Sequence, residues 1–178
     1  MNKGFTVWLT GLPGAGKATI SRLLEKRLKE NYGIKTEILT SETIRTNLSP
    51  EIEYSKLDQD VIIHCAIFLC KVLTRNGIAV ISTATSPLRA SREKARIEIN
   101  NFIEVYVKCP LEICAIRDTE GIHLAALQGN ILKFIGKSDL YEEPSNPDLV
   151  VETDKETAEE SAEKILKKLL DLEYIEGK

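Results

Sequence analysis

Residues 11–19 read GLPGAGKAT, in which the glycines and the lysine have the spacing of a Walker A loop. The glycines allow the backbone to curl so that consecutive N–H groups point inward, and such a ring of donors binds phosphate. Lys17 can neutralise the outer phosphates of a nucleotide as a point charge. The residues expected to contact the phosphates of ATP are Gly11, Pro13, Gly14, Ala15, Gly16, Lys17, Ala18 and Thr19.

Ala18 departs from the usual pattern, which has a serine or threonine directly after the lysine. The hydroxyl at that position normally binds Mg²⁺. Thr19 lies about 100° further around a helix, so it is better placed to reach a more interior phosphate. Losing one hydrogen bond or ligand to a charged group costs about 1.5–3 kcal/mol, or roughly 10–100-fold in affinity or rate. We therefore expect ATP to bind through Lys17 and the loop amides, with weakened placement of the metal.

Short β-rich runs alternate with helical patterns along the sequence. Strands are expected at 5–10, 35–40, 78–83, 102–108 and 148–153, and helices at 19–32, 54–77, 87–99 and 155–174. This alternation predicts a mostly parallel α/β sheet covered on both faces, in a single domain spanning residues 1–178. The Walker A loop follows the first strand and precedes the first helix, which is the context that such a loop requires.

Turn and capping signals separate these elements. Asn76-Gly77 is expected to end the second helix, and Thr153 or Asp154 to cap the last one. The stretch 118–147 is irregular, and a long irregular segment in a compact domain is often a lid or binding element. We expect this stretch to cover a site.

Composition excludes several classes of protein. With 24 basic and 27 acidic residues, the net charge is -3, so no basic stripe favours nucleic acid as a partner. No apolar run approaches the ~20 residues that span a membrane, and no signal peptide is evident, so we expect a cytoplasmic protein without a membrane partner. The cysteines have no metal-binding spacing and are expected to be buried reduced thiols, namely Cys65, Cys70, Cys109 and Cys114.

Four motifs together resemble the adenylylsulfate kinases, P-loop enzymes that transfer the γ-phosphate of ATP to the 3′-hydroxyl of adenosine 5′-phosphosulfate. The resemblance covers nearly the whole chain and rests on GLPGAGK (11–17), TSP (85–87), EVYVKCPLEICAIRDTEG (104–121) and FIGKSDLYEEPSNPDLVVET (134–153). It implies a three-layer α/β P-loop fold with a five-stranded parallel sheet in the order 2-3-1-4-5. It also implies ATP and Mg²⁺ as cofactors, 3′-phosphoadenylylsulfate as the product in sulfate assimilation, and a homodimer.

The resemblance also assigns roles to single residues. Glu42 stands where the family has an aspartate that handles metal and the acceptor hydroxyl, so it is expected to bind Mg²⁺ weakly, in part through water, while Thr40 replaces a second aspartate. Arg45 is expected to pair with the phosphosulfate. Arg117 is expected to stack on the ATP base or to pair with Asp118 or Glu112. The residues expected to bind the acceptor are Arg45, Tyr54, Ser86, Pro87 and Phe134, of which the two aromatic residues would enclose its adenine.

Three substitutions remove attraction for a dianionic acceptor. Gln59 stands in place of a family arginine, Ile62 in place of an asparagine and Glu120 in place of a lysine. The sequence therefore predicts an adenylylsulfate kinase-like phosphotransferase that is slow if these contacts matter. Two alternatives stay open: a kinase for another small hydroxyl acceptor, and a nucleotide-binding paralogue that regulates or pairs with an active kinase.

Arg89, Arg92 and Arg96 are spaced by three and four residues, so they share one face of the expected helix 87–99. A solvated stripe of charge, paired with Glu93, is one interpretation. The other interpretation is that these arginines act at the active site.

Overall fold

The computed structural model describes residues 3–48, 56–84, 86–117 and 141–176. Within these ranges the chain forms, in order, β1 (Phe5–Thr10), α1 (Lys17–Tyr32), β2 (Thr36–Leu39), α2 (Ser41–Leu48), α3 (Lys56–Arg75), β3 (Ala79–Ser82), α4 (Arg89–Glu98), β4 (Phe102–Lys108), α5 (Leu111–Ile116), β5 (Leu149–Glu152) and α7 (Ala158–Asp171).

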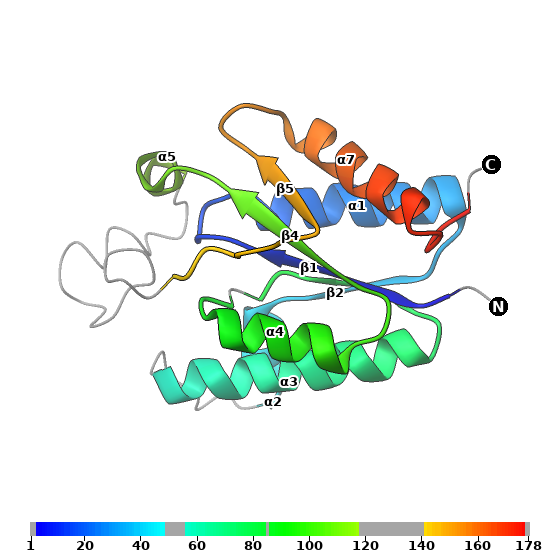
Figure 1. Ribbon diagram of the computed structural model, residues 1–178, viewed down its shortest axis with the longest axis horizontal. Coiled ribbons are helices and arrows are strands. Elements are labelled where there is room, and N and C mark those ends of the chain that lie inside the picture. Colours follow the sequence, from blue (N-terminus) through cyan, green and yellow to red (C-terminus); the bar gives the residue numbers. More distant parts are fainter. Residues whose placement is uncertain (1–2, 49–55, 85, 118–140, 177–178) are drawn as a thin grey trace.

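The five strands form one sheet in the order β2-β3-β1-β4-β5, and every neighbouring pair is parallel. The predicted strand order is therefore confirmed, and each observed strand lies within its predicted range. Helices α1 and α7 cover one face of the sheet, and α2, α3 and α4 lie on the other (Figure 1). The result is the expected three-layer α/β architecture.

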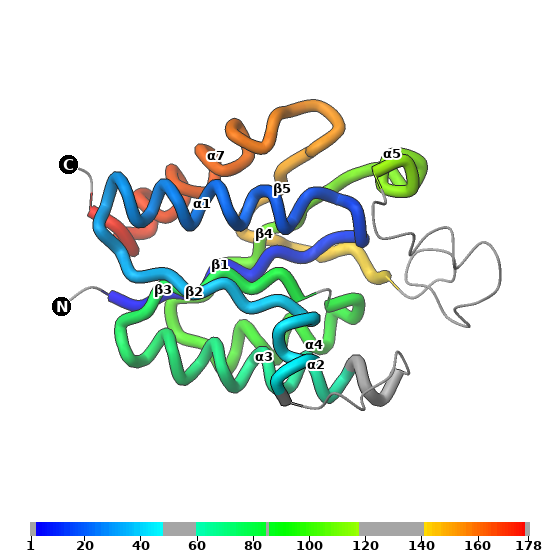
Figure 2. The backbone as a smooth tube through the Cα atoms, turned by 180° about the vertical axis from the view of Figure 1, so that it is seen from behind, coloured from blue at the N-terminus to red at the C-terminus, as the bar shows by residue number. Residues whose placement is uncertain are grey.

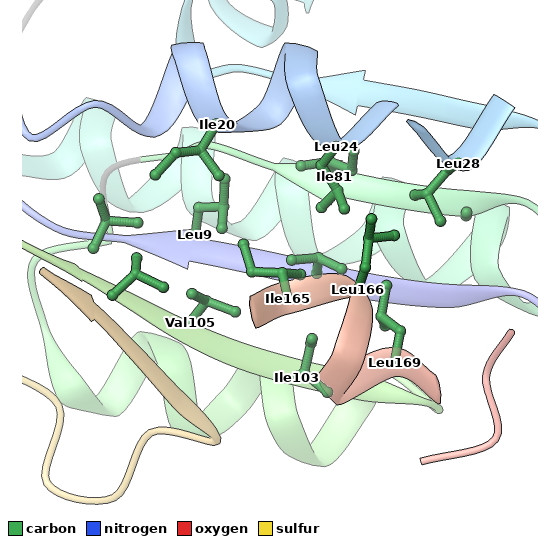
Figure 3. Close-up of a cluster of buried hydrophobic side chains, with 14 of the residues drawn as sticks. Leu9, Ile20, Leu24, Leu28, Ile81, Ile103, Val105, Ile165, Leu166 and Leu169 are labelled. Atoms are coloured by element: carbon green, nitrogen blue, oxygen red, sulfur yellow. The ribbon is translucent and has the colours of Figure 1, made fainter. Parts of the chain in front are cut away.

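The alternation of side chains along β1 supplies both layers of core. Phe5, Val7 and Leu9 belong to one buried cluster, whereas Trp8 belongs to the other, because successive side chains of a strand point to opposite faces. All six residues of β1 are buried, as expected for a central strand covered on both faces. Figure 3 shows the first cluster, in which the sheet meets α1 and α7 through Leu9, Ile20, Leu24, Leu28, Ile81, Ile103, Val105, Ile165, Leu166 and Leu169.

Helix ends follow local signals with one exception. The second predicted helix ends at Arg75, directly before Asn76-Gly77, as expected. The last helix begins later than predicted, and its N-cap is Thr157 rather than Thr153 or Asp154. Thr157 and Glu160 form a reciprocal capping box, in which each side chain accepts from the other residue's backbone N–H.

The sequence prediction gives no range for two of the described helices. Helix α2 has eight residues and α5 has six, and both are shorter than the window in which helical periodicity can be counted. In the described part of the chain, no helix has the length and apolar character needed to cross a membrane.

The carboxyl ends of the strands lie at one end of the molecule. The connection from β1 to α1, the start of α4 and helix α5 are all found there, and Figures 1 and 2 agree on this from opposite sides. In parallel α/β sheets, ligands bind at this edge.

Candidate active site

The Walker A loop is shaped by close contact with neighbouring backbone. Gly11 has φ 152° and Gly14 has φ 78°, conformations that residues with a Cβ rarely adopt. A Cβ at Gly11 would lie 2.3 Å from the carbonyl oxygen of Val107, and one at Gly14 would lie 2.5 Å from that of Cys114. The glycines therefore let the loop pack directly on the end of β4 and on α5.

Lys17 is folded into this loop. Its Nζ donates hydrogen bonds to the carbonyl oxygens of Gly11 and Leu12, both at 2.8 Å. The side chain is only 8% exposed, and this burial lowers the pKa of Lys17 to about 8. The loop thus holds its cation close to the positions that bound phosphates would occupy.

The first turn of α1 supplies no hydroxyl where a metal ligand is usual. Ala18 and Thr19 are both exposed. Ser21 is buried, and its hydroxyl donates to the carbonyl oxygen of Ala18 at 2.9 Å, so it does not stand in for the missing group. Within the described ranges, no three His, Cys, Asp or Glu side chains gather closely enough to hold a metal ion by themselves. Mg²⁺ therefore fits here only if the nucleotide and water provide most of its ligands.

Thr153 and Arg117 brace the loop from outside. The Thr153 hydroxyl donates to the carbonyl oxygen of Ala15 at 2.8 Å. Arg117 donates from Nη2 to the Thr153 carbonyl at 2.9 Å, and Nη1 lies 3.2 Å from the Thr153 hydroxyl. The predicted pairing of Arg117 with Glu112 is wrong, since its described partners are Thr153 and, more weakly, Cys109. Asp118, the other predicted partner, lies outside the described residues.

Thr40, which replaces a family aspartate, caps helix α2. Its hydroxyl accepts a hydrogen bond from the backbone N–H of Thr43 at 2.9 Å. Glu42 is exposed in the first turn of the helix, where the helix dipole favours a carboxylate. Arg45 is half-buried in the last turn of the same helix. The sequence signal that locates this helix is the threonine cap at the end of β2.

Ser86 and Pro87 lie beyond the end of β3 and are both buried. The Ser86 hydroxyl accepts a hydrogen bond from Trp8 Nε1 at 2.8 Å, and its carbonyl oxygen accepts one from Arg92. The Pro87 carbonyl accepts from the backbone N–H of Glu142 at 2.8 Å. This pair is therefore built into the interior, with its polar groups bonded to other parts of the protein.

Other residues expected on the acceptor side are only partly described. Tyr54, Phe134 and Glu120 lie outside the described residues, as does 118–140 of the expected lid. Gln59 lies in the first turn of α3, but its side chain also falls outside the described set. Ile62 is 4% exposed and packs in the core between α3 and the sheet.

The interpretation of the arginine face as a solvated stripe is wrong for its central member. Arg92 is 2% exposed, and its described carboxylate partner is Glu104 on β4, at 2.8 Å, rather than Glu93. Arg96 also pairs with Glu104, whereas Arg89 is exposed and contacts Glu142 and Glu143. A glutamate within the apolar strand FIEVYV is the signal that could have revealed this, because a buried carboxylate requires a partner.

The cysteines conform to expectation as free thiols. Three are buried as expected, whereas the expected burial is wrong for Cys65, which is half-buried. Burial raises the pKa of Cys70 and of Cys114 to about 12, so neither is a reactive thiolate at neutral pH.

The glycine loop closes around a lysine and connects a central parallel strand to a helix, at the carboxyl edge of a sheet with the order 2-3-1-4-5. These features define a P-loop kinase fold. Residues 3–152 match the profile of the adenylylsulphate kinase family. The chain belongs to this family.

Relatives and solved structures agree with this assignment. A probable adenylyl-sulfate kinase of Synechocystis is 45% identical over 175 residues, covering 98% of each chain. An adenylyl-sulfate kinase of Picosynechococcus is 47% identical over 174 residues, again covering 98% of each. The structure of the APS kinase CysC of Mycobacterium tuberculosis in complex with AMPPNP and APS has a TM-score of 0.88 and 32% identity, covering 95% of this chain and 99% of that one.

Proposed function

We propose that this chain transfers the γ-phosphate of ATP to the 3′-hydroxyl of adenosine 5′-phosphosulfate, giving 3′-phosphoadenylylsulfate and ADP. The observation that carries the proposal is the near-complete coverage, at about 45% identity, of relatives that are named for this reaction. The preformed loop around Lys17 supports the ATP half of the reaction.

The nucleotide half of the site would work by positioning and charge. The backbone N–H groups of residues 14–19 would bind the β- and γ-phosphates, and the positive end of α1 adds to their attraction. Lys17 would exchange its bonds to the loop carbonyls for bonds to phosphate oxygens. Mg²⁺, held by phosphates, water and Glu42, would neutralise charge on the transferred group.

The acceptor half would lie across the same edge of the sheet. Arg45 would bind the phosphosulfate with its forked donors, and Glu42 would orient or deprotonate the 3′-hydroxyl. The backbone around Ser86 and Pro87 would form one wall, because this segment is fixed by bonds from β1, from α4 and from the segment that leads into β5. On the ATP side of the site, Arg117 would contact the base of ATP from its position beside Thr153.

The test is turnover with defined acceptors. ADP release and 3′-phosphoadenylylsulfate should appear together when ATP, Mg²⁺ and adenosine 5′-phosphosulfate are present. The variant Lys17→Ala, which removes the ammonium, should abolish both. ADP release with a different acceptor, and none with adenosine 5′-phosphosulfate, would overturn the substrate assignment.

A binding-only paralogue is the second candidate, and Ala18 is the observation that favours it. It predicts saturable AMPPNP binding without ADP release from ATP in the presence of any acceptor tested. We also propose that the chain acts in the cytoplasm and that it forms a homodimer. Light scattering of the purified chain measures the molar mass and so tests the dimer.

A further inference from the structure

All three nitrogen atoms of the Arg92 guanidinium donate hydrogen bonds within the protein. Its Nε donates to Glu104 Oε1 at 2.8 Å, Nη1 donates to the carbonyl oxygen of Ser86, and Nη2 donates to that of Glu142. The guanidinium also lies 5.6 Å from the ring centroid of Tyr141. A lysine could not reproduce this arrangement, because it has a single donor atom and no planar fork.

The charge of Arg92 is balanced by a closed cluster of ion pairs. Glu104 pairs with both Arg92 and Arg96, and Arg96 pairs with Asp148 at 2.8 Å. Asp148 in turn accepts the backbone N–H of Glu104 at 2.7 Å. Two cations and two anions therefore compensate each other at the junction of α4, β4 and the start of β5.

The two carbonyl groups that Arg92 binds come from segments far apart in sequence. Ser86 follows β3, and Glu142 lies on the segment that leads into β5. The segments are also joined directly, because the N–H of Glu142 donates to the Pro87 carbonyl at 2.8 Å. Tyr141 extends the junction to the strand before the Walker A loop, through a 3.0 Å hydrogen bond between its hydroxyl and that of Thr10.

We propose that Arg92 is a positioning residue for the acceptor side of the site. By holding the carbonyls of Ser86 and Glu142 together, it fixes the Ser86–Pro87 wall against the segment 141–143. The phosphate loop is held by other contacts, those of Lys17 and Thr153, so nucleotide binding does not depend on Arg92. The inference rests on the proposed function for the identity of the acceptor.

Arg96 provides a matched control. It lies on the same helix, four residues further, and pairs with the same Glu104, but its described partners include neither of the two carbonyls. Arg92→Lys and Arg96→Lys therefore perturb the same ion-pair cluster, and only the first releases the acceptor wall.

The first measurement is steady-state kinetics of folded variants. Arg92→Lys should raise KM for adenosine 5′-phosphosulfate by about tenfold or more, the size expected for lost charged hydrogen bonds, and leave KM for ATP nearly unchanged. Arg96→Lys should leave both values nearly unchanged, even where Tm falls. An equal rise in acceptor KM for both variants would overturn the proposal, because it would mean that only general stability matters.

The second measurement is hydrogen exchange of the Glu142 N–H, which needs no acceptor. Arg92→Lys should speed this exchange by about tenfold relative to the wild type and to Arg96→Lys. Unchanged exchange in folded Arg92→Lys would refute the positioning role. If the wild type does not phosphorylate adenosine 5′-phosphosulfate, the proposed function fails and the exchange result still decides the role of Arg92.

A milder variant covers the case in which Arg92→Lys does not fold. Tyr141→Phe keeps the ring beside Arg92 and removes only the hydrogen bond to Thr10. It should raise acceptor KM and speed Glu142 exchange in the same direction, by a smaller factor. No change in either quantity would refute the contribution of the Thr10 bond to holding the segment 141–143.

Discussion

Raising the pH from 7 to 9 should weaken the binding of AMPPNP to this chain by about tenfold, because Lys17 loses its proton in that range. Burial lowers the pKa of Lys17 from 10.5 to about 8. At pH 7 roughly nine-tenths of free molecules carry the charged lysine, and at pH 9 about one-tenth do. Bound phosphate stabilises the ammonium, so affinity follows the charged fraction.

The assay is a calorimetric titration with AMPPNP at pH 7, 8 and 9, at fixed ionic strength and without Mg²⁺. Ionisation of the terminal phosphate of AMPPNP acts equally on the wild type and on a variant without the lysine, so the difference between the two proteins isolates the contribution of Lys17. The control is Lys17→Met, which should bind weakly and show no comparable dependence on pH.

Two outcomes would refute the reasoning. Affinity that is constant from pH 7 to 9 would mean that burial does not lower the pKa of Lys17 to the stated range. Affinity that increases with pH would contradict the sign. The same pKa shift also acts on folding: the unfolded chain keeps this proton up to about pH 10.5, so Lys17 should add stability as the pH rises from about 8 to 10.5.

Three further predictions, one with a matched control variant, test the loop and the helices. Gly14→Ala should reduce AMPPNP affinity more than tenfold, because the new Cβ would lie 2.5 Å from the carbonyl oxygen of Cys114. The control is Gly33→Ala, because Gly33 also has a positive φ, 65°, but a Cβ there would meet nothing within 4 Å. This control should lower the free energy of unfolding in urea by about 1–2 kcal/mol and leave AMPPNP affinity unchanged. Equal affinities for the two variants would contradict the packing argument. Ala18→Ser should tighten AMPPNP binding by up to about 100-fold in Mg²⁺ but not in EDTA, and no effect in Mg²⁺ would show that other groups hold the metal. Thr157→Ala should lower the free energy of unfolding by about 1 kcal/mol through loss of the capping box, whereas an unchanged midpoint in urea would show that the cap is dispensable.

The sheet was predictable from sequence because each strand carries its own signal. FTVWLT is a continuous apolar run, and β1 is buried at every position. The ranges of helices α2 and α5 could not be predicted because both helices are too short to show a period. The loop was predictable in the same local way, since its glycines and lysine are consecutive and its flanking strand and helix can be recognised.

The contacts that complete the site could not be predicted, because they join elements distant in sequence. The neighbours of Thr153 in sequence predict a helix cap, yet its hydroxyl donates to the carbonyl oxygen of Ala15. Helical spacing relates Arg92 only to residues three and four positions away, whereas its partners are Glu104 and the carbonyl oxygens of two loops. Periodicity describes only the element that a residue belongs to.

The bond between Thr153 and Ala15 spans 138 residues, and this separation has a consequence for biosynthesis. During translation the complete glycine-lysine sequence emerges early, whereas Thr153 directly follows β5, the last strand of the sheet to emerge. The nascent chain should therefore gain its affinity for nucleotide late, when β5 docks beside β4. ATP would then stabilise the completed fold, since a ligand that binds only the folded chain shifts the folding equilibrium toward it by mass action.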